Sequence, residues 1–191
     1  RDADGNYGDH GLTPAMRRIE SQLEHGRLVP DTDKFALKSP DRFKEKLARM
    51  ILRNPDKTPT ELAKEVHDAV RYTFLFPSGS YRQGIWEAHS FLESEGCDLE
   101  VRRNTWERAD YKGVNSRWRD TASDQLFEVQ FHTDDSWQAK QKTHLAYEKI
   151  EDVRTPRSEA QDLHAFQREV TRQVEVPQGV ENILDYHRDQ T

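Results

Sequence analysis

Val70-Arg71-Tyr72-Thr73-Phe74-Leu75-Phe76 is the stretch of sequence that predicts a β-strand most clearly. Its residues are mostly β-branched or aromatic, as strand interiors prefer, and Pro77-Ser78-Gly79 ends it with turn residues. Further along, residues 127–131 (Phe-Glu-Val-Gln-Phe) alternate apolar and polar side chains and predict a half-buried strand that closes the sheet. Weaker strand patterns at 99–104 and 113–119 lie between them. The strands therefore cluster in the middle of the chain.

Helical patterns lie around this group of strands. Thr13-Pro14, Ser39-Pro40 and Thr58-Pro59 each place a capping residue and a proline before apolar residues at helical spacing. The expected helices are 14–25, 40–53, 59–67, 81–95, 135–150, 157–174 and 178–187, and residues 1–12 are expected to be an irregular arm. Helices before and after a central group of strands predict an α+β domain, with a mixed sheet of four to five strands flanked by helices.

Length and composition exclude several classes of protein. A chain of 191 residues fits one domain, 1–191, and its net charge of −6 disfavours wrapping DNA, although a local basic pocket for a nucleotide stays possible. Apolar runs such as Phe74-Leu75-Phe76 are far shorter than the roughly 20 residues that cross a bilayer, so no membrane span is expected. Cys97 is the only cysteine, which excludes an internal disulfide and CxxC metal sites, and we expect it to be structural.

The chain begins at Arg1 rather than methionine, which indicates a processed protein or an excised domain. Secretion is the first expectation for its localisation. A cytoplasmic protein and a protein delivered into a target cell are the alternatives.

Two carboxylates stand beside the two best strand patterns. Asp68 precedes the first strand, and Glu128 lies within the last one, where it shares a face with Gln130. That face could simply meet solvent. Alternatively, two carboxylates from adjacent strands could hold Mg²⁺, which takes one or two carboxylates and completes its shell with water and phosphate oxygens.

A row of cations marks the helix expected at 40–53. Lys38, Arg42, Lys46 and Arg49 recur at spacings that place them along one side. They are either a solvated face or a ridge that binds a polyphosphate. No glycine-rich phosphate loop, HExxH zinc motif or nucleophile-elbow serine occurs, so phosphate would have to be bound by side chains.

The order and spacing of these segments resemble the RelA/SpoT-type nucleotide pyrophosphokinase domain, over roughly Lys34 to Lys149. The family's K-S motif matches Lys38-Ser39, its K-x-x-R motif matches Lys46 to Arg49, and its strand-entry aspartate matches Asp68, with Arg71-Tyr72 beyond it. Its N-G-Y-x-S-x-H motif matches Lys112 to Trp118. Its E-V-Q-I-R-T motif matches Glu128 to Thr133, and its A-H-W-x-Y motif matches Thr143 to Tyr147. The chain departs at Ala36, Arg42 and Val114, where the family carries an ATP-binding arginine, a serine and a guanine-stacking aromatic. Without hydrolase or regulatory regions it resembles a small single-domain alarmone synthetase, similar to secreted actinobacterial or toxin relatives.

The resemblance implies transfer of the β,γ-pyrophosphate of ATP to the 3′-hydroxyl of a purine nucleotide, with AMP released and Mg²⁺ as the cofactor. The implied catalytic residues are Asp68, Arg71 and Glu128, of which Asp68 and Glu128 would also hold the metal. The implied ATP-binding residues are Lys38, Ser39, Arg42, Lys46 and Arg49. The implied acceptor-binding residues are Arg103, Tyr111, Asn115, Gln130, His144 and Tyr147.

The missing aromatic at Val114 predicts a purine acceptor, adenine included, without a strict demand for guanine, unless Trp106, Tyr111 or Trp118 offers another stacking surface. Two alternatives stay open. One is a toxin that pyrophosphorylates the 3′ end of tRNA, with a basic surface formed by Arg102, Arg103, Arg108, Arg117 and Arg119. The other is a non-catalytic α+β interaction domain. The sequence does not predict the oligomeric state.

Overall fold

The structure, a computed structural model, describes residues 10–152 and 154–188, so most of the expected arm at 1–12 lies outside the described residues. The α-helices are α1 (Leu12–Gln22), α2 (Thr32–Phe35), α3 (Pro40–Arg53), α4 (Pro59–Lys64), α5 (Tyr81–Ser94), α6 (Asp134–Glu151) and α7 (Arg157–Arg172). The strands are β1 (Arg27–Leu28), β2 (Arg71–Leu75), β3 (Cys97–Asn104), β4 (Val114–Asp120), β5 (Gln125–His132) and β6 (Tyr186–His187). Short 3₁₀ turns cover His67–Ala69, Ser78–Ser80 and Val180–Asn182.

The strands form one mixed sheet in the order β1-β2-β5-β4-β3-β6. Only the central pair, β2 and β5, is parallel, whereas every other neighbouring pair of strands in the described sheet is antiparallel. The expected α+β class with a mixed sheet is therefore confirmed. The sheet has six strands instead of four to five, because the two-residue strands β1 and β6 add to its edges.

The expected helix at 178–187 is wrong. This segment forms a 3₁₀ turn followed by β6, because β3 holds it through hydrogen bonds. The Asn104 side chain donates to the carbonyls of Val180 and Ile183, and the Asn104 backbone N–H donates to Asp185. The helix expected at 59–67 ends at Lys64, and a 3₁₀ turn carries Asp68 instead.

The first helix starts before its expected cap. Gly11 precedes α1, and the Thr13 hydroxyl lies 2.7 Å from the Tyr72 hydroxyl instead of capping the helix. Thr58 caps α4 as predicted, and its side chain and that of Glu61 form a capping box.

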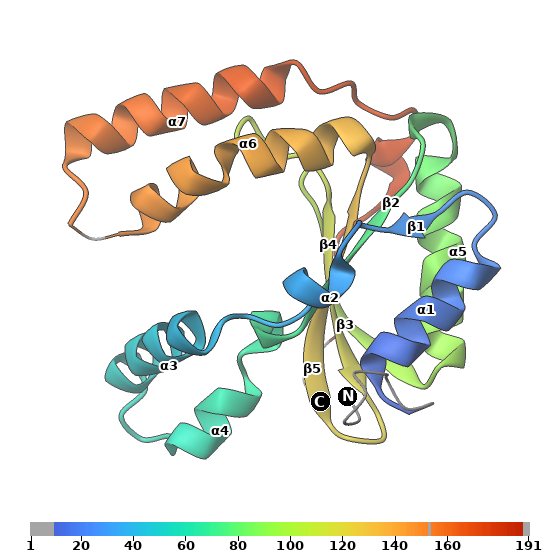
Figure 1. The fold of residues 1–191 in the computed structure, drawn as a ribbon, viewed down its shortest axis with the longest axis horizontal. Coiled ribbons are helices and arrows are strands. Elements are labelled where there is room, and N and C mark those ends of the chain that lie inside the picture. The colour runs from blue at the N-terminus through green and yellow to red at the C-terminus, as the bar shows by residue number, and fades with distance from the viewer. Residues whose placement is uncertain (1–9, 153, 189–191) are drawn as a thin grey trace.

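The hydrophobic core lies on one face of the sheet. Figure 1 shows α1 and α5 covering this face, while α3, α4, α6 and α7 extend on the other side. Phe127, Val129 and Phe131 of β5 are fully buried in this core, as the alternation in their sequence predicts. Glu128 and Gln130 therefore project from the opposite face, where α3 and α6 approach. No helix among the described residues is long and apolar enough to cross a membrane.

Gly84 of α5 offers a test of this packing. A Cβ atom there would lie 2.2 Å from Cδ1 of the fully buried Phe76 ring. We expect Gly84→Ala to lower the free energy of unfolding by about 1–3 kcal/mol, because overpacking outweighs the gain of up to about 1 kcal/mol in helix propensity. Urea denaturation measures the change. In the control, Gly79→Ala, no atom lies within 4 Å of the new Cβ and the change should stay within about 0.5 kcal/mol. Equal stability of the two variants would contradict the packing described.

Candidate active site

Three separate segments meet at the start of β2. Residues 36–38 run beside residues 69–71, since the Lys38 N–H donates to the Ala69 carbonyl and the Arg71 N–H donates to the Ala36 carbonyl. On the other side, parallel pairing places Arg71 opposite Glu128 of β5. Backbone hydrogen bonds thus gather Lys38, Asp68, Arg71 and Glu128 from positions up to 90 residues apart in the sequence.

Asp68 is surrounded by cations. Its carboxylate oxygens lie 2.5 Å from Lys46 Nζ and 3.0 Å from Lys38 Nζ, and Arg71 Nη2 is 3.4 Å away. Burial raises the pKa of this carboxyl, but the hydrogen bonds and charges of Lys46 and Lys38 outweigh burial and hold the pKa well below its usual range. Asp68 is therefore ionised at neutral pH.

Glu128 is the second carboxylate of the site. Arg71 Nε donates to its Oε2 at 2.6 Å, and Gln130 Nε2 donates to its Oε1 at 3.1 Å. Burial raises the pKa of Glu128, yet the charge of Arg71 and the hydrogen bonds from Gln130 and Arg71 bring the pKa below its ordinary value. One guanidinium thus joins both carboxylates. Ionised carboxylate oxygens are the donors that Mg²⁺ accepts in proteins, and one or two carboxylates are enough for it. No cluster of three or more metal-ligating side chains occurs in the described part of the chain.

Lys140 of α6 is a site residue that the sequence interpretation missed. Its ammonium group donates to Gln130 Oε1 and lies 4.6 Å from the centroid of the Trp137 ring. Burial and the charge of Arg71 lower the pKa of Lys140 to about 7, against the opposing effect of Glu128. A cavity of about 160 Å³ reaches this position, lined by Arg71, Thr73, Trp137, Lys140 and His144 among others.

Arg117 of β4 is a second residue of the site, which the sequence interpretation had assigned only to a possible tRNA-binding surface. It lies opposite Glu128 in the sheet register, and its Nε is buried without a hydrogen-bond partner among the described residues. Arg117 lies two residues after Asn115 on β4, so both side chains project from the same face of the sheet. This spacing could have indicated that Arg117 faces the site. Together with Lys38, Lys46, Arg71 and Lys140, Arg117 gives the site five cations around two carboxylates. A chain with a net charge of −6 thus carries a local excess of positive charge, which suits a polyanion.

Tyr111 and Asn115 form a rigid network beside the cations. The Tyr111 hydroxyl donates to Asn115 Oδ1 at 2.9 Å and lies 2.9 Å from Nε2 of His132. His132 is fully buried, and its Nδ1 lies 2.9 Å from the Ser136 hydroxyl. Burial holds the pKa of His132 well below its usual range, so the ring is neutral. Asn115 of β4 lies directly opposite Gln130 of β5, so the two residues expected to bind the acceptor are neighbours.

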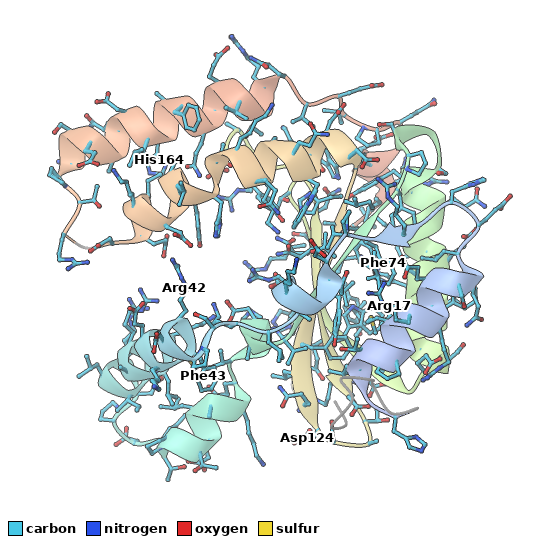
Figure 2. The ribbon with its side chains drawn as sticks, viewed as in Figure 1. Arg17, Arg42, Phe43, Phe74, Asp124 and His164 are labelled. Carbon is cyan, nitrogen blue, oxygen red and sulfur yellow. The ribbon has the colours of Figure 1, made fainter. Side chains whose placement is uncertain are left out.

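The row of four cations formed by Lys38, which precedes α3, and three residues of α3 is divided. Lys38 and Lys46 reach Asp68, whereas Arg42 Nη2 lies 2.7 Å from Glu148 of α6. Figure 2 shows Arg42 on the side of α3 that faces α6. Arg49 is exposed and makes no ion pair with the described residues. The four cations therefore do not form one continuous ridge for a polyphosphate, because they have different partners. Helix spacing places them on one side but does not predict which of them contact a carboxylate from another element.

The other sequence candidates lie at the edges of the site. Ser39 caps α3, accepting the Arg42 N–H at 3.4 Å, which already explains its presence. His144 Nε2 lies 2.9 Å from the same Glu148 carboxylate that binds Arg42. Arg103 is exposed beside Asn115 on the neighbouring strand, and Tyr147 is 53% exposed.

The structure changes how the departure at Val114 is interpreted. Val114 is fully buried in the core, so its side chain does not face the site. Trp118 and Trp106 are also buried and cannot stack on a nucleotide base from there. Of the proposed substitutes, only Tyr111 lies in the site, and its hydroxyl is already hydrogen-bonded.

The arginines proposed as a tRNA-binding surface do not lie together. Arg102 is buried on the α5 side of the sheet, and Arg117 projects from the opposite face. Arg108 pairs with Asp110, and Arg119 pairs with Glu100 and Asp124. Among the described residues these five arginines therefore do not form one basic surface for tRNA.

No family model and no curated protein sequence matches the chain. Solved structures do match. A GTP pyrophosphokinase family protein from Streptococcus pneumoniae aligns with a TM-score of 0.53 and 16% identity, over 85% of this chain and 79% of that one. Small alarmone synthetase 1 from Bacillus subtilis, bound to its product pppGpp, aligns with a TM-score of 0.53 and 12% identity, over 90% and 86% of the two chains. Small alarmone synthetase 2 from the same organism aligns at 0.50 and 13%, over 84% and 82%. The chain therefore has the RelA/SpoT-type fold of the small alarmone synthetases.

The lowered pKa of Lys140 predicts a dependence of stability on pH. Between pH 7 and its unfolded pKa near 10.4, the unfolded chain binds a proton at Lys140 that the folded chain has released. This one group therefore makes the free energy of unfolding rise with pH, by at most about 1.4 kcal/mol per pH unit. Denaturant unfolding from pH 7 to 9 should show a smaller upward slope in Lys140→Met than in the wild type. Lys142→Met, on the exposed side of α6, is the control and should keep the wild-type slope. Identical slopes in all three proteins would contradict the burial of the Lys140 ammonium group.

Proposed function

We propose that the chain is a nucleotide pyrophosphokinase that transfers the β,γ-pyrophosphate of ATP to the 3′-hydroxyl of a purine nucleotide and releases AMP. The observation that carries the proposal is the group of five cations around Asp68 and Glu128. The fold shared with solved alarmone synthetases supports it. Transfer of this kind depends mainly on positioning and on stabilising charge, which is the chemistry these side chains offer.

Lys38, Lys46 and Arg71 would bind the ATP phosphates. Without substrate, Asp68 and Glu128 hold these long side chains in one place. Phosphate oxygens can then replace the carboxylates as partners of these cations. Since the side chains are already ordered, binding loses less conformational entropy. Lys140, when protonated, would add a further positive charge from α6.

Asp68 and Glu128 fit a Mg²⁺ ion as its protein ligands, because both are ionised and both lie in contact with the same Arg71 side chain, which a bound metal would have to displace in part. When bound, the metal would neutralise charge on the phosphate oxygens. Glu128 would also accept the proton of the acceptor 3′-hydroxyl while that oxygen attacks the β-phosphorus. The bond between the β-phosphorus and the oxygen bridging to the α-phosphate breaks, and AMP leaves. Gln130 keeps Glu128 oriented through its 3.1 Å hydrogen bond.

Asn115, Tyr111 and Gln130 would bind the acceptor, with Arg103, His144 and Tyr147 at the periphery. We expect adenine and guanine nucleotides both to be accepted, because neither Val114 nor the two buried tryptophans presents a stacking surface to the site. Rates of transfer to ATP or ADP compared with GTP or GDP measure this preference. A preference for guanine above a hundredfold would show that another group selects the base.

The most direct mutational test is Glu128→Gln, which preserves shape and removes the negative charge. We expect the transfer rate to fall by about 10² or more, since a metal ligand and a base are lost together. Separation of AMP and pyrophosphorylated products measures the rate, and circular dichroism verifies the fold. Glu87→Gln on α5, across the sheet from the site, is the control and should retain activity. Activity of Glu128→Gln within tenfold of the wild type would remove Glu128 from the mechanism.

Lys46→Ala tests the cations separately. It removes the ammonium group 2.5 Å from Asp68, and we expect the KM for ATP to rise at least about tenfold, consistent with a lost charge-assisted contact to phosphate. The comparison with Arg49→Ala is informative, because Arg49 is on the same helix but has no ion pair with the described residues. We expect a smaller effect there. Unchanged ATP kinetics in Lys46→Ala would favour a merely structural ion pair with Asp68.

A further inference from the structure

A second and larger cavity, of about 470 Å³, lies on the other side of the sheet, between α5, β3 and β6. Its volume falls within the range of roughly 300–1,000 Å³ typical of small-molecule sites. Trp86, His89, Arg102 and Tyr186 are among the residues that line it. Arg102 pairs with Ser116 across the strands and projects from the face opposite Glu128, so this cavity is separate from the candidate active site.

Arg102 is the central group of this cavity. It is only 9% exposed, and it forms no ion pair with any carboxylate of the described residues. Its Nε donates to the Leu184 carbonyl at 2.9 Å, and its Nη1 lies 3.5 Å from Nδ1 of His89. Burial and the charge of Arg102 lower the pKa of His89 to about 3, so this neighbour is neutral and supplies no counter-charge. The charge of Asp185 favours the charged form of Arg102, but no carboxylate of the described residues forms an ion pair with it. An anion that contacts this nearly buried guanidinium directly would therefore be favourable.

Aromatic side chains border the same cavity. The Arg102 guanidinium carbon lies 4.5 Å from the centroid of the Trp86 ring, which fixes the guanidinium plane further. Trp86 is 40% exposed and Tyr186 is 42% exposed, which leaves surface on which a flat group can stack.

The remaining charges limit the size of the anion. Arg188 also lines the cavity, but it is paired with Asp98 at 2.9 Å, and Glu93 adds a further carboxylate. Arg102 is thus one cation without an ion pair, near the carboxylates of Glu93, Asp98 and Asp185, which favours a single phosphate group over a chain of phosphates. The carboxylates can instead accept hydrogen bonds from hydroxyl or amino groups.

We propose that this cavity is a binding site for a nucleoside monophosphate, with the phosphate on Arg102, the base on the exposed aromatic rings, and ribose or amino groups on Glu93 and Asp98. The site is independent of the pyrophosphokinase chemistry proposed above. If that chemistry holds, the released AMP is a molecule of this class, and the cavity would allow it to bind away from the reaction centre.

The test is calorimetric titration of the full chain with AMP, without Mg²⁺ or ATP. We expect Arg102→Gln to weaken AMP binding at least tenfold and Trp86→Leu to weaken it at least threefold. Adenosine and inorganic phosphate, each lacking one part of the ligand, should each bind at least tenfold more weakly than AMP. Lys46→Ala alters only the candidate active site, so it should leave the AMP binding that depends on Arg102 and Trp86 unchanged.

Three results would overturn the proposal. They are no AMP binding at millimolar concentration, equal affinity in the wild type and Trp86→Leu, and loss of binding in Lys46→Ala with retention in Arg102→Gln. If Arg102→Gln does not fold, because the hydrogen bond to Leu184 is lost, the more exposed Trp86→Leu decides. The cavity is tested by AMP binding, whereas the proposed activity is tested by pyrophosphate transfer. Failure of one therefore does not imply failure of the other.

Discussion

The parallel pairing of β2 with β5, which sets Arg71 beside Glu128, is the constraint on which the site depends. A shift of one residue would turn Glu128 and Gln130 into the core and Phe127, Val129 and Phe131 out of it, so burial of the three apolar residues fixes the register. The 36–38 segment then hydrogen-bonds beside residues 69–71 and delivers Lys38 to Asp68. The same apolar packing that stabilises the sheet therefore also fixes the positions of the charged groups.

Repulsion among the cations is the physical cost of this arrangement. Five cations share one face of the sheet, and the two carboxylates offset them only partly. Arg71 contacts both carboxylates, so displacing either one alters the other. A polyphosphate would relieve the remaining repulsion, which is why we regard the ion pairs as a prepared binding site and not only as a source of stability. The link from Arg42 to Glu148 and His144 connects α3 to α6 at the opening of the same site.

Local patterns predicted the parts of the structure that local forces determine. The alternation in 127–131 gave the correct face for Glu128, and the capping residues located α3 and α4 within a few residues. The segment 178–187 could not be predicted, because Asn104, some 76 residues earlier, decides its conformation. Lys140 was missed for a similar reason: nothing near it in the sequence shows that α6 turns it toward Gln130. Val114 was placed in the right strand but assigned to the wrong environment, since strand position alone does not say which face the core covers.

The central claim is that the chain moves two phosphates from ATP as one unit. The direct measurement is to incubate the full chain with Mg²⁺, ATP labelled in the γ-phosphate, and a purine nucleotide, and then to separate and identify the products. The account predicts AMP and an acceptor carrying a labelled 3′-pyrophosphate in equal amounts. Formation of ADP with a singly phosphorylated acceptor, or no AMP with any purine nucleotide, would contradict it.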